Sequence, residues 1–149
     1  MTDREGYVVE AADKVKQEIE YAALPVLPQK KDYKIGIIGS GFIVQNCHLA
    51  AYRKAGFCPG AITSLDEARC HELARQYKIP NVYLDWKEMA DDQEIEIIDI
   101  AVPPHVQLEM VEYICSHAPH IKAILCQKPL AMSEGAAKKE VQAGDTAGD

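Results

Sequence analysis

The stretch KIGIIGSGFIV, Lys34–Val44, decides the fold of this chain. Its first half is a run of β-branched and other apolar residues, which predicts a buried strand over Lys34–Ile38. Its second half has the spacing Gly39-x-Gly41-x-x-Val44, and such a turn between a strand and a helix often holds the phosphates of a dinucleotide. The third position is not glycine, so the turn is either a cofactor site or only a tight corner.

The rest of the chain alternates between apolar runs of strand length and segments with helical signals. Further strands are expected at 61–64, 82–84, 95–102 and 121–126. Helices are expected from Phe42 to about Gly56, at 66–77 with Asp66 as N-cap, at 85–91, at 105–116, and after Ser133, where Gly135 and Gly144 predict a weak helix that frays. This alternation predicts an α/β fold, a Rossmann-type doubly wound parallel sheet with helices on both faces. The ligand crevice of such a sheet lies at the carboxyl ends of its strands.

Composition and charge exclude several classes of protein. The chain has 149 residues, about the size of one domain, with 48% hydrophobic and 26% charged residues. A net charge of −7 argues against broad electrostatic attraction to nucleic acid or to an anionic membrane. No apolar run approaches the roughly 20 residues that a bilayer span needs.

The cysteines favour reduced thiols in a cytoplasmic compartment. There are five, an odd number, and no C-x-x-C pair occurs. Cys115, His117 and His120 lie close together in sequence, but a helix end followed by a proline-containing loop explains them better than a metal site does. We therefore expect no bound metal.

Residues 1–32 differ from the rest of the chain. Apolar residues recur at helical spacing between charged ones from Val8 to Ala22, and Pro25 and Pro28 then end any helix. This pattern predicts an amphipathic N-terminal extension that packs on its own domain or on a partner, followed by a dinucleotide-binding domain over 33–149.

The chemistry of a phosphate site matches the glycine turn. Gly39 permits the tight turn, and Gly41 lets phosphates approach the main-chain N–H groups. The helix that begins at Phe42 and Ile43 offers its positive end to the same anion. The third glycine of the fingerprint serves helix–strand packing, so Val44 weakens the match more than it weakens the site.

The residues that follow the second expected strand do not decide between NAD and NADP. The fingerprint asks for an acidic residue there to hold the ribose hydroxyls, but the strand ends at Ser64. Asp66 comes two residues late and is expected to cap a helix. Arg69, which could favour a 2′-phosphate, is five positions away.

Three motifs in order carry a resemblance to a known family. They are GIIGSGFIVQNCHLAAYRKAG at 36–56, DIAVPPHVQLEMV at 99–111 and LCQKPLAMS at 125–133. Together they resemble the glucose-fructose oxidoreductase and inositol dehydrogenase (Gfo/Idh/MocA) family. The resemblance covers about residues 33–149, and it implies a Rossmann domain that is normally followed by an α/β substrate domain; we expect that second domain to be absent from this chain.

The resemblance implies a catalytic role for Lys128. The Glu-Lys-Pro motif of the family stands here as Gln127-Lys128-Pro129. An ammonium group at that strand end would hydrogen-bond a substrate hydroxyl and stabilise negative charge during hydride transfer. Without the motif, a solvated lysine in a turn would be the better interpretation. Gln127 replaces a carboxylate that usually contacts the nicotinamide ribose, and its amide is expected to keep such a contact.

The loop after the fourth strand resembles the family only in part. Val102 and the proline pair that begins at Pro103 are expected to form the wall beside the nicotinamide. Gln107 stands where the family usually has histidine, so a cofactor contact is carried over but no acid–base chemistry. His105 is expected to start a surface helix, and His48, which matches a family histidine, to give packing or polar support.

These expectations favour the cofactor-binding half of an NAD(P)-dependent dehydrogenase that acts on a sugar-like or polyol substrate. The chain alone is expected to bind dinucleotide with little turnover, because nothing in it closes the substrate side. The alternative is a non-catalytic dinucleotide-binding or assembly module whose N-terminal arm docks a partner, and a homo-oligomer is possible in either case. A third alternative is a poorly folding product with an exposed sheet edge.

Overall fold

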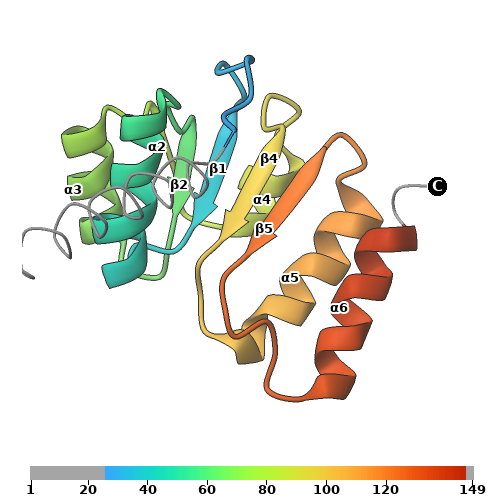
Figure 1. Ribbon diagram of the computed structural model, residues 1–149. Coiled ribbons are helices and arrows are strands. Elements are labelled where there is room, and N and C mark those ends of the chain that lie inside the picture. The colour runs from blue at the N-terminus through green and yellow to red at the C-terminus, as the bar shows by residue number, and fades with distance from the viewer. Residues whose placement is uncertain (1–25, 147–149) are drawn as a thin grey trace, which may run out of the picture.

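The computed structural model describes residues 26–146, and the ribbon in Figure 1 shows strands and helices alternating along the chain. The strands are β1 Ile35–Ile38, β2 Ala61–Thr63, β3 Asn81–Tyr83, β4 Ile97–Ile100 and β5 Ala123–Cys126. The helical elements are η1 Val44–His48, α2 Leu49–Ala55, α3 Glu67–Tyr77, α4 Trp86–Asp91, α5 Pro104–His117 and α6 Glu134–Thr146. The expected N-terminal helix falls within residues 1–25, which lie outside the described residues.

The five strands form one parallel sheet in the order β3-β2-β1-β4-β5. The order reverses at β1, because the chain first builds outward to β3 and then returns to place β4 on the other side of β1. This confirms the predicted Rossmann-type doubly wound sheet. The expected strand at 95–102 was too long, since only Ile97–Ile100 pairs with β1. Ile95 precedes the strand and is buried in the core.

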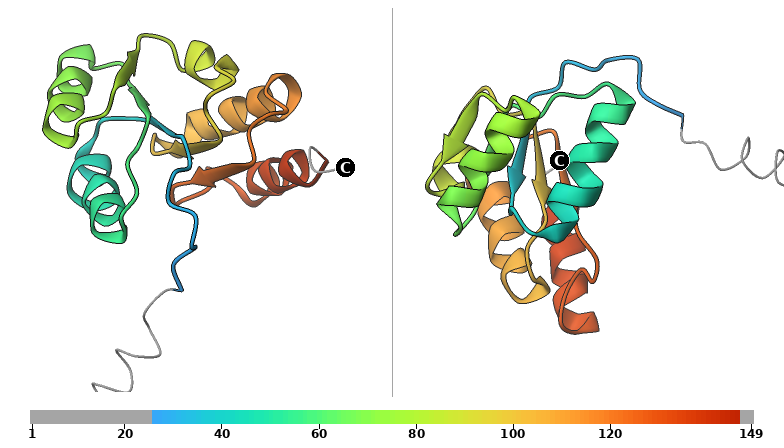
Figure 2. Two further views of the ribbon diagram at one scale, coloured as in Figure 1. Left: turned by 90° about the horizontal axis from the view of Figure 1, so that it is seen from above. Right: turned by 90° about the vertical axis from the view of Figure 1, so that its left-hand side faces the viewer.

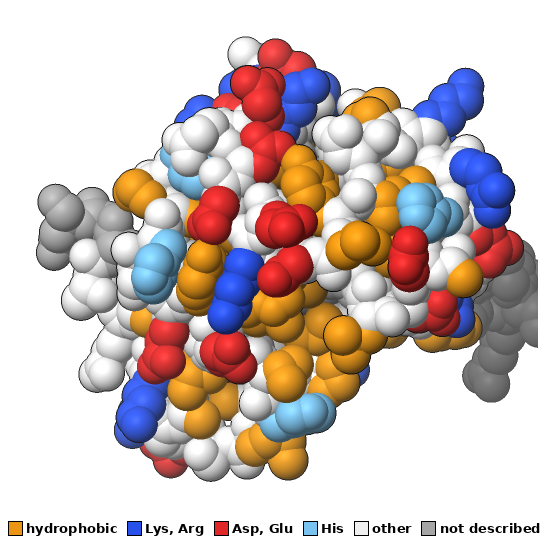
Figure 3. All heavy atoms as spheres, turned by 180° about the vertical axis from the view of Figure 1, so that it is seen from behind, with side chains coloured by type: hydrophobic (Ala, Val, Ile, Leu, Met, Phe, Trp, Pro, Cys, Tyr) orange, Lys and Arg blue, Asp and Glu red, His pale blue; other side chains and the backbone are white. Residues whose placement is uncertain are grey.

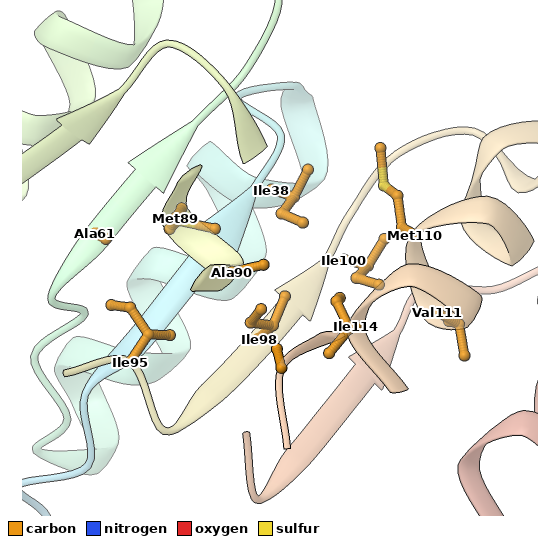
Figure 4. Packing of buried hydrophobic residues seen from close by; sticks show 11 residues of the cluster. Ile38, Ala61, Met89, Ala90, Ile95, Ile98, Ile100, Met110, Val111 and Ile114 are labelled. Carbon is orange, nitrogen blue, oxygen red and sulfur yellow. The ribbon is translucent and has the colours of Figure 1, made fainter. Parts of the chain in front are cut away.

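Helices cover both faces of the sheet, as seen from above and from the side in Figure 2. One buried cluster joins Ile37 and Ile62 of the sheet to Leu49 of α2 and Leu73 of α3. The other joins the opposite face to α4 and α5, and Figure 4 shows Met89, Met110 and Ile114 approaching the strands. Complete burial of β1, with no residue exposed, follows from this two-sided cover.

The segment after the glycine turn is helical as expected, but not regularly α-helical. Val44–His48 forms a π-helical turn before α2 continues to Ala55. Gly56 ends the helix in a left-handed conformation with φ +82°, the position that the sequence predicts for its stop. Val44 is completely buried, so it takes the packing place that the third glycine holds in the fingerprint.

Two expected helix caps are present. The Asp66 carboxylate accepts a hydrogen bond from the main-chain nitrogen of Arg69 at 3.0 Å, and α3 begins directly after it. Ser133 Oγ accepts from the main-chain nitrogen of Ala136 at 3.2 Å at the start of α6. The fraying expected of α6 stays a prediction.

Charged side chains of both signs are intermixed with apolar ones on the surface seen from behind in Figure 3. Among residues 26–146, no helix is both long and apolar enough to cross a membrane. In the same part of the chain, no three histidine, cysteine or acidic residues gather as metal ligands would. His117 and His120 instead lie near the main-chain oxygens of Tyr113 and Asp92, at 3.1 and 3.0 Å.

Candidate dinucleotide site

The glycine bend and the lysine motif lie at the same edge of the sheet. Main-chain hydrogen bonds run past the strand ends, from the Gly39 nitrogen to the Thr63 oxygen at 2.7 Å and from the Gln127 nitrogen to the Ile100 oxygen at 3.0 Å. Between them, the Ala101 nitrogen donates to the Ile38 oxygen at 2.9 Å. The loops after β1, β4 and β5 therefore meet at the carboxyl edge, the lower edge in Figure 1.

Gly39 is required by the close approach of β4. Its φ of +121° is one that residues with a side chain rarely adopt, and a Cβ atom there would lie 2.5 Å from the Ala101 oxygen. This corner is tight because main chain meets main chain. The fold therefore requires glycine at position 39 whether or not a ligand binds.

Gly41 lies in open space. A Cβ atom added to it would meet no heavy atom within 4 Å, and its φ lies outside the left-handed region. The fold itself therefore does not require glycine at this position. An anion approaching the main-chain N–H groups of the bend would require it, because a side chain would occupy the same space.

The first helical residues after the bend are exposed. Phe42 is 70% exposed and Ile43 38%, although both are large and apolar. The Gln45 nitrogen donates to the Gly41 oxygen at 3.1 Å, so the helical turn opens directly at the bend. The first N–H groups of a helix have no partner within it, and together with the helix dipole they form a donor set that fits a diphosphate.

The end of β2 supplies hydroxyls and no free carboxylate. Ser40 Oγ donates to Ser64 Oγ at 2.8 Å, which ties the bend to the loop after β2. Asp66 is committed to capping α3, and Leu65 before it is fully exposed. Arg69 Nη2 donates to the Gln45 side-chain oxygen at 2.6 Å, so this guanidinium lies beside the helix that follows the bend.

The lysine loop begins where β5 ends. Lys128 is exposed, and its peptide bond to Pro129 is cis. Its main-chain nitrogen donates to Gln127 Oε1 at 2.8 Å, while Gln127 Nε2 lies 2.7 Å from His48 Nε2. The side chain of Gln127 is thus engaged by the protein itself.

Gln107, which is expected to contact the cofactor, is hydrogen-bonded by the protein itself. Its side chain is completely buried, and Nε2 donates to the Val102 and Gln127 oxygens at 2.9 and 3.2 Å, with the Pro129 oxygen at 3.5 Å. It therefore joins the β4 and β5 loops from behind, leaving exposed Pro103 and half-buried Val102 at the surface. Sequence reasoning could not find this, because the three acceptors are main-chain oxygens of two separate loops.

A buried carboxylate that the sequence analysis missed supports His48. Asp99 in β4 is 2% exposed, and its Oδ2 lies 2.8 Å from His48 Nδ1 and accepts from the Tyr52 hydroxyl at 2.7 Å. Burial and the nearby Asp99 raise the pKa of the Tyr52 hydroxyl, so this group stays protonated. The signal was a charged residue within the apolar run IEIIDIAV, opposite a helix with His and Tyr four residues apart. This arrangement agrees with the polar support expected of His48, while His105 is exposed on α5.

A doubly wound parallel sheet with an open glycine bend at its carboxyl edge defines a dinucleotide-binding Rossmann domain. Comparison with known proteins identifies its family. Residues 33–149 match the family GFO_IDH_MocA, described as "Oxidoreductase family, NAD-binding Rossmann fold", and the chain belongs to this family. The predicted resemblance is therefore confirmed, and so is the dinucleotide as the cofactor of this fold.

The relatives are oxidoreductases, and each is much longer than this chain. Levoglucosan dehydrogenase of Pseudarthrobacter phenanthrenivorans is 30% identical over 110 residues, which is 68% of this chain and 27% of that protein. An NAD binding oxidoreductase from Klebsiella pneumoniae has 31% identity and a TM-score of 0.68, covering 80% of this chain and 33% of its own. Levoglucosan dehydrogenase in complex with NADH has 30% identity and a TM-score of 0.63, covering 75% and 32%. The chain thus spans about a third of the length of these relatives.

Proposed function

We propose that this chain is the cofactor-binding part of an NAD(P)-dependent dehydrogenase, and that the complete enzyme moves a hydride between the nicotinamide and a sugar-like or polyol substrate. One observation carries the proposal. The bend is open at Gly41, where an added Cβ atom would meet no heavy atom within 4 Å, and it shares the carboxyl edge of the sheet with Lys128. The name levoglucosan dehydrogenase, and its complex with NADH and L-sorbose, support a substrate of the sugar class.

In this proposal the residues of the edge divide the dinucleotide between them. Gly41, with the helix start at Phe42 and Ile43, would hold the diphosphate through N–H groups and the helix dipole, while Gly39, whose own N–H donates to the Thr63 oxygen, forms the tight corner before them. Ser64 lies where the adenosine ribose is held in such folds. The nicotinamide half would then lie toward β4 and β5, along the loops that contain Val102, Pro103, Gln127 and Lys128.

Lys128 is the proposed catalytic residue. If the complete enzyme oxidises an alcohol, the carbon would give its hydride to the nicotinamide and the hydroxyl proton would pass to water or to a general base of that enzyme. An ammonium group that hydrogen-bonds this oxygen stabilises the negative charge that develops on it. Lys128 is exposed at the edge of the sheet, free of the packing that buries Gln107 behind it.

Titration with NADH and NADPH, followed by nicotinamide fluorescence, tests the proposal. The chain is expected to bind at least one of the two dinucleotides. Lys128→Met should leave the thermal unfolding temperature unchanged because the side chain is exposed, while a full-length enzyme carrying this change should lose turnover. Absence of binding of both dinucleotides at millimolar concentration would refute the proposal.

The second candidate is a non-catalytic dinucleotide-binding or assembly module. Gln127 favours it, since the family carboxylate is replaced and its amide is held by His48 and the Lys128 nitrogen. A hydride-transfer screen on sugars and polyols with a full-length enzyme separates the two candidates. Binding without any turnover would support the module.

A further inference from the structure

A chain of hydrogen bonds connects the buried Asp99 to the main chain of Lys128. Asp99 pairs with His48 Nδ1, His48 Nε2 faces the Gln127 amide, and Gln127 accepts from the Lys128 nitrogen, with distances of 2.8, 2.7 and 2.8 Å. These residues come from β4, the helix after the glycine bend, and the loop after β5. This series of hydrogen bonds therefore runs beneath the proposed nicotinamide side of the site.

The direction of every bond follows from one fixed donor. The main-chain nitrogen of Lys128 can only donate, so it requires the oxygen of the Gln127 amide. This places the NH₂ group of Gln127 against His48 Nε2, and NH₂ can only donate. His48 Nε2 must then be an acceptor, which leaves the ring proton on Nδ1, where it is donated to Asp99.

We infer that His48 is a positioning residue whose neutral Nδ1–H form holds the Lys128 loop through Gln127, and that protonation of His48 releases this hold. A second ring proton on Nε2 would face the NH₂ group, and two donors repel. Rotating the Gln127 amide would satisfy His48 but would turn NH₂ toward the Lys128 nitrogen. One of the two hydrogen bonds is lost in either case.

The surroundings of His48 allow such a change of charge. Its side chain is 19% exposed and borders an open hollow of about 320 Å³, so solvent protons reach the ring. The titratable groups that face it are Asp99 from β4, Tyr52 from α2 and Cys126 from β5. Burial raises the pKa of Tyr52 and raises that of Cys126 to about 11, so both of these groups stay neutral. Histidine is the side chain that changes charge between about pH 5 and 8.

Position 127 then determines which form of His48 fits. Glutamine donates to Nε2 and suits the neutral ring. Glutamate, the residue that the family usually has there, accepts only when ionised, so it suits a ring that carries both protons. Gln127→Glu should therefore favour the ring form of His48 that carries both protons.

Nuclear magnetic resonance on the ¹⁵N-labelled chain, without dinucleotide, tests the inference. At pH 7.5, the His48 ring should show a protonated Nδ1 and an unprotonated Nε2. On titration to pH 5.5, the Lys128 amide signal should move with the same midpoint as the His48 ring. A proton on Nε2 in the neutral ring, or a Lys128 amide that does not follow His48, would overturn the inference.

A matched control lies elsewhere on the chain. Gln93 Nε2 is 3.2 Å from His120 Nδ1 at an exposed site with no connection to the loop after β5. Gln93→Glu makes the same chemical change beside a histidine, and it should leave the Lys128 amide and its midpoint unchanged, whereas Gln127→Glu should alter both. Equal responses of the two variants would refute the coupling.

The importance of the Lys128 loop for catalysis rests on the proposed function, but the measurement of the Lys128 amide does not. If the chain binds no dinucleotide and the Lys128 amide still follows His48, only the proposed function fails. If dinucleotide binds and the amide does not follow, only this inference fails.

Discussion

Replacing Gly41 by alanine separates folding from cofactor binding. A Cβ atom at position 41 meets no heavy atom within 4 Å, and the backbone there needs no left-handed φ. We therefore expect Gly41→Ala to change the free energy of unfolding by less than about 0.5 kcal/mol, as an unhindered surface substitution does. The same methyl group would stand in the space that the diphosphate needs to reach the main-chain N–H groups.

The size of the binding loss follows from the contact that is blocked. A hydrogen bond to a charged group contributes about 1.5–3 kcal/mol. Since about 1.4 kcal/mol corresponds to a tenfold change, loss of one such bond weakens NADH binding roughly 10- to 150-fold. Fluorescence titration of parent and variant, together with thermal unfolding of both, measures the two effects.

Two glycines serve as controls. Gly135 in α6 also has nothing within 4 Å of an added Cβ atom, so Gly135→Ala should leave NADH binding unchanged and stabilise the helix by about 0.5–1 kcal/mol. Gly39→Ala should instead destabilise the fold, because its Cβ atom would lie 2.5 Å from the Ala101 oxygen at a φ of +121°. If Gly41→Ala bound NADH as tightly as the parent, the diphosphate would not lie at this bend, and the reasoning would be refuted.

Three further predictions concern titratable groups. Burial raises the pKa of Cys126 to about 11, so iodoacetamide at pH 8 should label the exposed Cys47 at least about tenfold faster, and equal rates by mass spectrometry would contradict this. Glu140 is buried without a hydrogen-bond partner among the described residues, and burial raises the pKa of its carboxyl group. The folded protein is therefore favoured at low pH, where Glu140 is protonated, and it loses stability as the pH rises through the pKa of Glu140. Glu140→Gln should stabilise the fold by about 1–3 kcal/mol at pH 7.5 and less at pH 5, measured by denaturant unfolding; a stability change independent of pH would refute the assignment. The Lys122 ammonium chiefly holds the pKa of Glu96 at about 2, below its ordinary 4.5, so stability from this carboxylate is lost as pH falls toward 2, and Glu96→Gln should flatten the acid side of the stability curve. An unchanged acid side would show that the ion pair contributes nothing.

Local patterns were enough to predict most of the architecture. The apolar runs located all five strands, and Gly56, Asp66 and Ser133 marked helix ends because the groups that cap a helix lie within a few residues of each other. Strand ends were less accurate. An apolar run predicts burial, but pairing with a neighbour decides where a strand stops, and the run at 95–102 pairs only over Ile97–Ile100.

The sequence by itself determined the family, the doubly wound sheet and the placement of the glycine bend and Lys128 at one edge, since the direction of parallel strands follows from their alternation with helices. Tertiary structure alone decided that Gln107 lies buried behind both loops, and that Asp99 is joined through His48 to Gln127. Those partners are separated by tens of residues in the chain, and several are main-chain atoms that no side-chain pattern records. Only folding brings such groups within hydrogen-bonding distance.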